Sequence, residues 1–172
     1  MLIGLSSGTL QGLESLFIYL LIYVISSINI WTIVLSLKDN SGYNRYITDL
    51  SFLGEKNPIL AITLTLCLFS MAGVPPLAGF YAKFYVFFSA IESSVYILAF
   101  IGVITSVIGS FYYIRLIKIM YFEKPKVWRS FHKIDYVKSI ILGLTFLFIL
   151  CFFVYPVPLY LLAHKLALTL VI

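Results

Sequence analysis

Charged side chains are scarce in this sequence. Only 11% of its 172 residues are charged, 62% are hydrophobic, and the mean hydropathy is +1.04. A typical soluble domain has about 25% charged residues and about 45–50% apolar ones. This composition excludes an ordinary water-soluble domain and indicates a protein of the lipid bilayer.

Residues that bind metals or form disulfides are also few. The chain has two cysteines and two histidines, and no pair of His, Cys, Asp and Glu residues has metal-ligand spacing. No glycine-rich loop follows a strand pattern, so a nucleotide site is not indicated either. We therefore expect no metal and no cofactor in this chain.

The basic residues do not form a nucleic-acid surface. Twelve Lys and Arg face seven Asp and Glu, but most of the twelve lie in two segments between apolar runs. The first segment holds Lys38, Arg45 and Lys56, and the second holds Arg115, Lys118, Lys124, Lys126, Arg129, Lys133 and Lys138. We expect no nucleic-acid partner. By the positive-inside rule, both basic segments face one side of the membrane and both termini face the other.

The apolar runs predict an all-α integral membrane protein with about four transmembrane helices in a single domain, 1–172. About 20 helical residues cross a bilayer core of about 30 Å. The expected spans are about 16–37, 58–91, 95–120 and 139–155, and residues 159–172 are expected to form a short helix at the membrane surface.

The second span is too long for one straight helix. Roughly 34 residues would form a helix of about 50 Å, which exceeds the hydrocarbon core. Gly73, Pro75, Pro76 and Gly79 lie near its middle. Prolines remove backbone donors and clash with the preceding turn, so we predict a discontinuous helix broken near Gly73–Gly79.

Lys83 lies deep within this second span, with apolar sequence continuing to Ala90. Burying a charge there costs at least about 2.5–3.5 kcal/mol on insertion scales, and such groups usually serve transport. Lys83 is therefore the candidate proton relay, a group that gains and loses a proton as nearby charges change. The competing interpretation is that its long stem carries the ammonium group to the membrane surface near Glu92.

Hydroxyl groups near Lys83 in the sequence are candidates for a water path through the span. They belong to Ser70, Tyr81, Tyr85 and Ser89. Carbonyl groups freed at the break would add polar partners. Glu14 and Glu92 are instead expected to be solvated caps at span ends, and His132 and His164 to be surface residues.

Two blocks of sequence resemble a known family. They are NPILAIT at 57–63 with FSMAGVPPLAGFYAKFY at 69–85, and VITSVIGSFYYIRL at 103–116. These blocks resemble subunit 2 of mitochondrial respiratory complex I, in its plant and protist forms. The resemblance extends over nearly the whole chain.

This resemblance implies a fold and a function. The spans would correspond to the last four of an antiporter-like subunit with fourteen helices, and Lys83 to the functional lysine of its second discontinuous helix. The function implied is a membrane-arm component of proton-pumping NADH:ubiquinone oxidoreductase, with part of a proton path coupled to quinone reduction. No redox catalysis is expected from this chain alone, because flavin and iron–sulfur clusters would lie in other subunits.

The resemblance also implies a location and partners. The location is the mitochondrial inner membrane, with both termini toward the intermembrane space and the basic loops toward the matrix. Helices that precede these four in the family are missing here, so we expect either a split gene, which Met1 favours, or a piece of a longer product. The expected partners are the missing N-terminal part on another chain, other membrane-arm subunits including a neighbouring antiporter-like subunit, and lipids.

Two other functions fit the same sequence features. The chain could be a structural piece that packs and anchors the membrane arm, with Lys83 in a static ion pair. Alternatively, it could be a subunit of a multisubunit cation/proton antiporter, since such subunits share the lysine on a broken helix.

Overall fold

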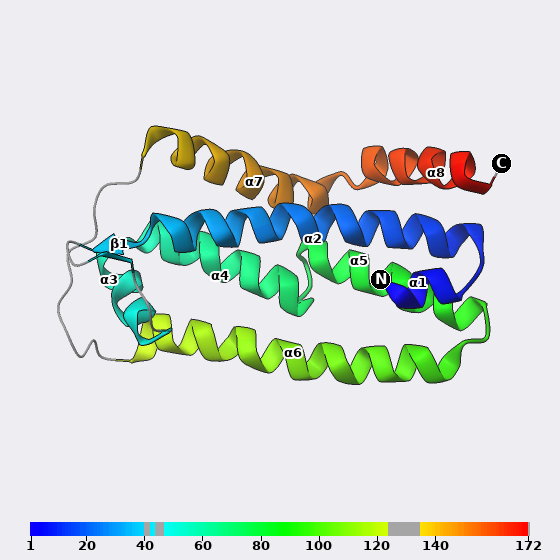
Figure 1. Ribbon diagram of the computed structural model, residues 1–172, viewed down its shortest axis with the longest axis horizontal. Helices are drawn as coiled ribbons and strands as arrows, with labels where there is room; N and C mark the ends of the chain where they lie inside the picture. The colour runs from blue at the N-terminus through cyan, green and yellow to red at the C-terminus, as the bar shows by residue number, and fades with distance from the viewer. Residues whose placement is uncertain (40–41, 44–46, 124–134, 172) are drawn as a thin grey trace.

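A computed structural model describes residues 1–39, 42–43, 47–123 and 135–171 (Figure 1). The described chain is helical except for two paired two-residue strands. Its elements are α1 (Leu2–Ser6), α2 (Leu10–Ser36), β1 (Lys38–Asp39), β2 (Gly42–Tyr43), the 3-10 helix η1 (Ile47–Phe52), α3 (Leu53–Lys56), α4 (Pro58–Ala72), α5 (Ala78–Glu92), α6 (Tyr96–Phe122), α7 (Tyr136–Val154) and α8 (Val157–Val171). Several residues of the two basic segments lie outside the described residues: Arg45, Lys124, Lys126, Arg129, His132 and Lys133.

The long helix α2 forms the centre of the bundle. Thr9 caps its first turn, because the Thr9 hydroxyl accepts a hydrogen bond from the N–H of Gly12 at 3.2 Å. No charged residue follows Glu14 before Lys38, so 27 residues continue as one helix of about 40 Å. Helices α4 and α5 pack along one side of α2, and α7 and α8 pack along another (Figure 1).

Helices α4 and α5 follow each other along α2 with a turn between them. α4 ends at Ala72 and α5 begins at Ala78. The turn contains Pro75 and Pro76, whose side chains are exposed and whose shared peptide bond is cis. Each helix has 15 residues and is therefore about 22 Å long.

The buried apolar side chains form two clusters along α2. The first lies around the N-terminal half of α2, α5 and the junction of α7 with α8, and consists of Ile18, Ile22, Cys67, Ala78, Ala82, Ile149, Phe152, Leu159 and Ala163. The second lies around the C-terminal half of α2, α4 and the end of α6, and consists of Ile33, Leu37, Leu53, Leu60, Ala61, Leu64, Leu68, Met120 and Leu142. The break between α4 and α5 lies where these clusters meet.

Two described helices are long and apolar enough to cross a membrane, namely α2 and α6. Residues Tyr136–Phe152 and Val157–Leu170 pass the same test together as a pair bent by 90°. Helix α6 buries only Ala99, Ile119 and Met120 among its residues and exposes many large apolar side chains. Such a surface fits contact with lipid or other membrane helices.

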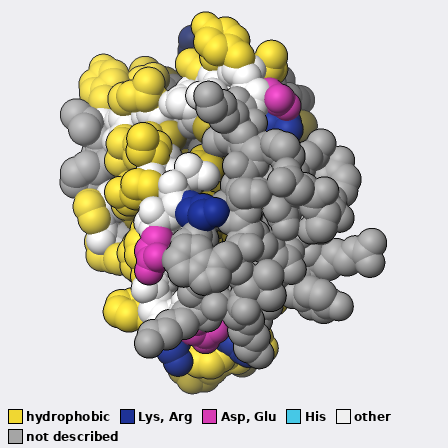
Figure 2. Space-filling model, turned by 90° about the vertical axis from the view of Figure 1, so that its left-hand side faces the viewer, with side chains coloured by type: hydrophobic (Ala, Val, Ile, Leu, Met, Phe, Trp, Pro, Cys, Tyr) yellow, Lys and Arg dark blue, Asp and Glu magenta, His cyan; other side chains and the backbone are white. Residues whose placement is uncertain are grey.

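Charged side chains gather at the end of the bundle where α2 meets β1. Figure 2 views this end, where basic and acidic side chains of the described residues appear among apolar ones. One pair there is Lys138 and Asp135, whose charged groups lie 3.1 Å apart at the start of α7. Charged residues next to apolar helices are typical of a membrane–water boundary.

Candidate functional site

The turn after α4 begins with a glycine in the left-handed conformation. Gly73 has φ of +87°, and its N–H donates to the carbonyl groups of Phe69 and Ser70, each at 3.0 Å. The N–H of Val74 also donates to the Phe69 carbonyl at 3.0 Å. This is the Schellman motif, which favours glycine because positive φ strains residues with a side chain. The motif leaves the carbonyl of Ala72, the last residue of α4, without a helical partner.

The first turn of α5 is capped by a side chain from α4. Ser70 is fully buried, and its Oγ accepts a hydrogen bond from the N–H of Gly79 at 3.0 Å. A Cβ on Gly79 would lie 1.8 Å from the Ser70 carbonyl oxygen, so only glycine allows this approach. Helix α4 thus supplies a hydrogen bond that the N-terminus of α5 lacks.

Lys83 caps the other side of the break. Its Nζ donates to the carbonyl oxygen of Ala72 at 2.9 Å. The ammonium group therefore lies at the C-terminal end of α4, where the partial negative charge of the helix favours a cation. The lysine stem crosses Gly73, because a Cβ on Gly73 would lie 3.0 Å from the Lys83 Cδ. The half-buried side chain thus turns back to the break, away from the end of α5.

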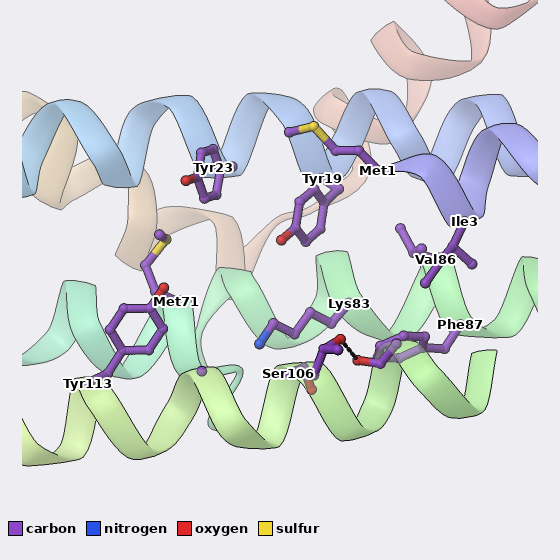
Figure 3. A pocket seen from close by; sticks show the side chains of 13 residues that line it. Met1, Ile3, Tyr19, Tyr23, Met71, Lys83, Val86, Phe87, Ser106 and Tyr113 are labelled. Carbon is purple, nitrogen blue, oxygen red and sulfur yellow. Dashed lines mark hydrogen bonds between the residues drawn. The ribbon is translucent and has the colours of Figure 1, made fainter. Parts of the chain in front are cut away.

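A cavity of about 290 Å³ lies beside Lys83. Figure 3 shows the lysine between α2 and α6, with Tyr19 and Tyr23 on the α2 side and Ser106 on the α6 side. Tyr113 of α6 adds a further hydroxyl group to the lining. Hydroxyl oxygens both donate and accept hydrogen bonds, so this lining is suited to ordering water around an ammonium group.

A second cavity, of about 20 Å³, extends from Lys83 to the inward face of α2. Ser70 and Ser26 both line it. Ser26 is buried, and its Oγ has no hydrogen-bond partner among the described residues. A cavity of this volume is large enough for about one water molecule, which would satisfy such a hydroxyl.

The residues predicted to share a water path with Lys83 lie in different surroundings. Ser70 lines the small cavity together with Lys83. Tyr81 instead packs edge-on against Phe152 of α7, with ring centroids 6.1 Å apart. Tyr81 is thus part of the contact between α5 and α7.

The other two predicted residues lie further along α5, toward its C-terminus. The ring of Tyr85 is 6.4 Å from that of Tyr160 in α8. The Oγ of Ser89 lies 3.2 Å from the Oγ of Ser15 in α2. These two contacts place Tyr85 and Ser89 near a pair of polar residues whose contact was not predicted from the sequence.

That polar pair is Glu14 of α2 and His164 of α8. Glu14 is only 4% exposed, and its Oε1 lies 2.6 Å from the Nδ1 of His164. The ring of Tyr160 stacks on His164, with centroids 6.4 Å apart and an angle of 10°. The expectation that Glu14 is a solvated cap is therefore wrong, whereas His164 does lie near the surface, since its side chain is 43% exposed. The buried alanines Ala163 and Ala167 lie beside the pair on α8 and let α8 approach α2 closely.

The sequence contained a signal for Glu14. The buried residues of α2 recur at helical spacing, and polar residues interrupt the apolar ones: Glu14, Ile18, Ile22, Ser26, Asn29, Ile33 and Ser36 belong to this stripe. Polar groups within a span usually face the protein interior. Asn29 follows this rule, because its Nδ2 donates to the Thr145 Oγ1 of α7 at 2.6 Å.

Metal coordination finds no support in the part of the chain that the structure describes. There, no group of three or more His, Cys, Asp and Glu residues lies close enough together to hold an ion. The polar groups at the break are an amine, hydroxyls and backbone carbonyls. The amine can take up and release a proton, the hydroxyls can donate and accept hydrogen bonds, and the carbonyls can accept them.

A protein-family model matches residues 1–109 of this chain, and its description is NADH:quinone oxidoreductase/Mrp antiporter, TM. The matched segment includes the break and Lys83. NADH-ubiquinone oxidoreductase chain 2 of Marchantia polymorpha is 52% identical over 170 residues, which cover 99% of this chain and 34% of the relative. NADH-quinone oxidoreductase subunit N of Parvibaculum lavamentivorans is 42% identical over 158 residues, which cover 92% of this chain and 32% of the relative.

The chain therefore spans about a third of the length of these relatives. A similar solved structure is a chain of respiratory complex I from Thermus thermophilus with bound aureothin, with a TM-score of 0.78 at 21% identity. The match covers 92% of this chain and 35% of the other. This likeness shows a shared helical membrane fold.

Proposed function

Because this chain belongs to the NADH:quinone oxidoreductase/Mrp antiporter transmembrane family, we propose that it is a membrane-arm component of a proton-pumping NADH:ubiquinone oxidoreductase. In this proposal it contributes part of a proton path coupled to quinone reduction. The names of its plant and bacterial relatives support the assignment. Flavin and iron–sulfur clusters belong to other subunits, so this chain carries no redox step.

The observation that carries this proposal is the position of the Lys83 ammonium group. Its Nζ lies 2.9 Å from the carbonyl of Ala72, at the end of a helix and beside a hydroxyl-lined cavity. A protonated lysine there is held by the carbonyl and by the helix dipole. A cation arriving nearby repels the ammonium group, and a proton then passes from Nζ to water as an N–H bond breaks and an O–H bond forms. The neutral amine is held less strongly and can take up the next proton.

The proposal includes a membrane arrangement for the whole chain as one domain. Helices α4 and α5 would form a single discontinuous span, because each alone, at about 22 Å, is shorter than a bilayer core of about 30 Å. The other spans would be α2, α6 and α7. Broken spans are common where transporters hold ions, since their free backbone groups face protein or water.

The proposed location is the mitochondrial inner membrane, with the basic loops toward the matrix and both termini toward the intermembrane space. The positive-inside rule supports this orientation. The proposed partners are a separate polypeptide with the remaining part of the subunit, a neighbouring antiporter-like subunit, other membrane-arm subunits and lipids. The chain spans 34% of the Marchantia relative, so the remaining part of the subunit is either on a separate chain or in a longer product that includes this one.

Replacement of Lys83 by Met tests the proton path. In the assembled complex, K83M removes the titratable amine but keeps an apolar stem of similar length. We expect proton pumping and coupled quinone reduction to fall by about a hundredfold, the lower end of what a positioned acid–base group contributes. The measurements are NADH:quinone turnover and acidification of proteoliposomes, with assembly checked on native gels.

Lys118→Met is the matched control, because Lys118 is exposed near the end of α6. It should assemble and pump as the unaltered complex does. Lys83→Arg adds a second comparison, since an arginine keeps the cation but does not release its proton. Full pumping by an assembled K83M complex would reject the proton path and leave a purely structural function for this chain.

The family description also includes Mrp antiporters. A subunit of a cation/proton antiporter would use the same lysine without quinone chemistry. Co-purification separates the two functions, because flavin and iron–sulfur proteins should accompany this chain only in the oxidoreductase.

A further inference from the structure

Among the described residues, Glu14 and His164 form a contact between titratable groups that is separate from the Lys83 site. It joins the N-terminal part of α2 to α8 at 2.6 Å. Tyr160 lies close enough to interact with the charge of Glu14, and Tyr85 of α5 lies next to Tyr160. The titratable groups around the pair thus come from α5 and α8.

Glu14 is buried, and its hydrogen-bond partner is His164. An isolated carboxylate removed from water is strongly unfavourable, whereas a carboxylate that accepts a hydrogen bond from an imidazole is not. The Glu14 side chain is 6% exposed and the His164 side chain is 43% exposed. The carboxylate is therefore enclosed, and the imidazole ring extends from it toward the surface of the chain.

The two ring nitrogens of His164 have different surroundings. Nδ1 lies 2.6 Å from the Glu14 Oε1, so in the tautomer that carries hydrogen on Nδ1 this N–H donates a hydrogen bond to the carboxylate. Nε2 lies on the opposite side of the ring and is left to accept a proton. When Nε2 takes up a proton, the ring becomes an imidazolium, and the enclosed carboxylate stabilises this cation, as in other carboxylate–histidine pairs.

The pair lies between Lys83 and the end of α5. Ser89 follows Lys83 by six residues, which corresponds to about 9 Å along the helix. The hydroxyls of Ser89 and Ser15 lie 3.2 Å apart, and Ser15 is next to Glu14 in α2. Beyond Ser89, α5 continues only to Glu92, its last residue.

We propose that Glu14 and His164 form a proton-transfer site that connects the Lys83 cavity with the end of the bundle near Glu92. His164 accepts a proton from a hydronium ion at Nε2, where an N–H bond forms as an O–H bond breaks. It then releases the proton from Nε2 to another water molecule, as that N–H bond breaks and an O–H bond forms. Glu14 is the positioning residue, since it holds Nδ1 and balances the charge. This inference rests on the proposed proton path at Lys83.

His164→Gln separates proton transfer from simple attachment of α8. A glutamine amide can still donate a hydrogen bond to Glu14, but it does not take up a proton at neutral pH. In the assembled complex we expect H164Q to lower proton pumping and coupled NADH:quinone turnover by at least about tenfold. Glu14→Gln should also lower both, because it removes the charge that stabilises the imidazolium. Lys165→Gln is the control, since Lys165 is exposed next to His164 and should be replaceable without effect.

Pumping and assembly of these variants together test the proposed site at Glu14 and His164. Normal pumping by an assembled H164Q complex overturns it, because the hydrogen bond alone is then sufficient. Failure of both H164Q and E14Q to assemble also overturns it and assigns the pair to the attachment of α8. The K83M complex is measured in parallel. If K83M pumps normally, the proposed function itself fails, whereas loss of pumping in K83M with normal pumping in H164Q rejects only the site at Glu14 and His164.

Discussion

Ser70 and Lys83 each complete the hydrogen bonding of a helix to which they do not belong. Ser70 is in α4 and accepts from the N–H of Gly79 in α5, while Lys83 is in α5 and donates to the carbonyl of Ala72 in α4. A broken helix exposes donors on one side and acceptors on the other. The two side chains cross the break in opposite directions. Lys83, the proposed proton carrier, therefore also stabilises the junction between α4 and α5.

Ser70 can be replaced without changing Lys83, so its contribution to the stability of the break can be measured separately. In Ser70→Ala, the buried N–H of Gly79 loses its acceptor, which should destabilise the subunit by about 1–3 kcal/mol. We expect a lower temperature of half-inactivation for the complex. Ser110→Ala is the control, because the partly exposed Ser110 donates within its own helix, to the Val107 carbonyl at 2.7 Å. Equal thermal stability of the two variants would contradict the role of Ser70.

Residues that act locally were predictable from the sequence, and residues that act across the fold were not. Gly73 and the prolines indicate a break by their own backbone properties, and Lys83 is conspicuous as a charge among apolar neighbours. Glu14 and His164 are 150 residues apart, so the buried stripe of α2 indicates that Glu14 faces the interior but not which residue it contacts. Their contact depends on how α8 packs against α2, which local pattern does not specify.

At the scale of the element, close packing positions the beginning of α5 as much as hydrogen bonds do. Gly79 lies against the backbone of Ser70, and Ala78 and Ala82 are buried next to it. These small residues bring α5 close to both α4 and α2. The Tyr81 ring projects instead toward α7, which explains why a hydroxyl near Lys83 in sequence is not near it in space.

Gly79→Ala tests this close approach. The added Cβ would overlap the Ser70 carbonyl, so α4 and α5 must separate, at a cost above the roughly 1–3 kcal/mol of ordinary overpacking. We expect the complex to lose thermal stability strongly or not to assemble on native gels. Gly143→Ala in α7 is the matched control, because a Cβ there meets nothing within 4 Å. The close approach is not needed if both variants assemble with equal stability.

At the scale of the whole molecule, the helices differ in how much of their surface the chain itself covers. α2 is surrounded by α4, α5, α7 and α8, whereas α6 exposes most of its apolar side chains. An apolar surface of this extent fits a subunit embedded among other membrane helices. The cavity beside Lys83 is lined in part by α6, so the helix that the described chain covers least also contributes to the site.

The proposed orientation predicts which parts of the chain a protease reaches. A tag on the C-terminus should be digested in mitochondria whose outer membrane has been ruptured, because it faces the intermembrane space. The same tag inserted between α6 and α7 should stay protected until the inner membrane is dissolved. The control is a matrix protein, which must survive the first treatment. Protection of the C-terminal tag with digestion of the inserted one would reverse the orientation.

The crossed contacts at the break also have a consequence for biogenesis. Ala72 and Lys83 are eleven residues apart, so α4 is synthesised before the side chain that completes its last turn. Until Lys83 is added, the nascent α4 is shorter than the bilayer core and its Ala72 carbonyl has no hydrogen-bond donor. In turn, the Gly79 N–H in the first turn of α5 depends on Ser70 of α4 for its acceptor. We therefore expect α4 and α5 to enter the membrane together. A nascent chain that stalls between them would expose unpaired backbone groups of α4, which are unfavourable in lipid.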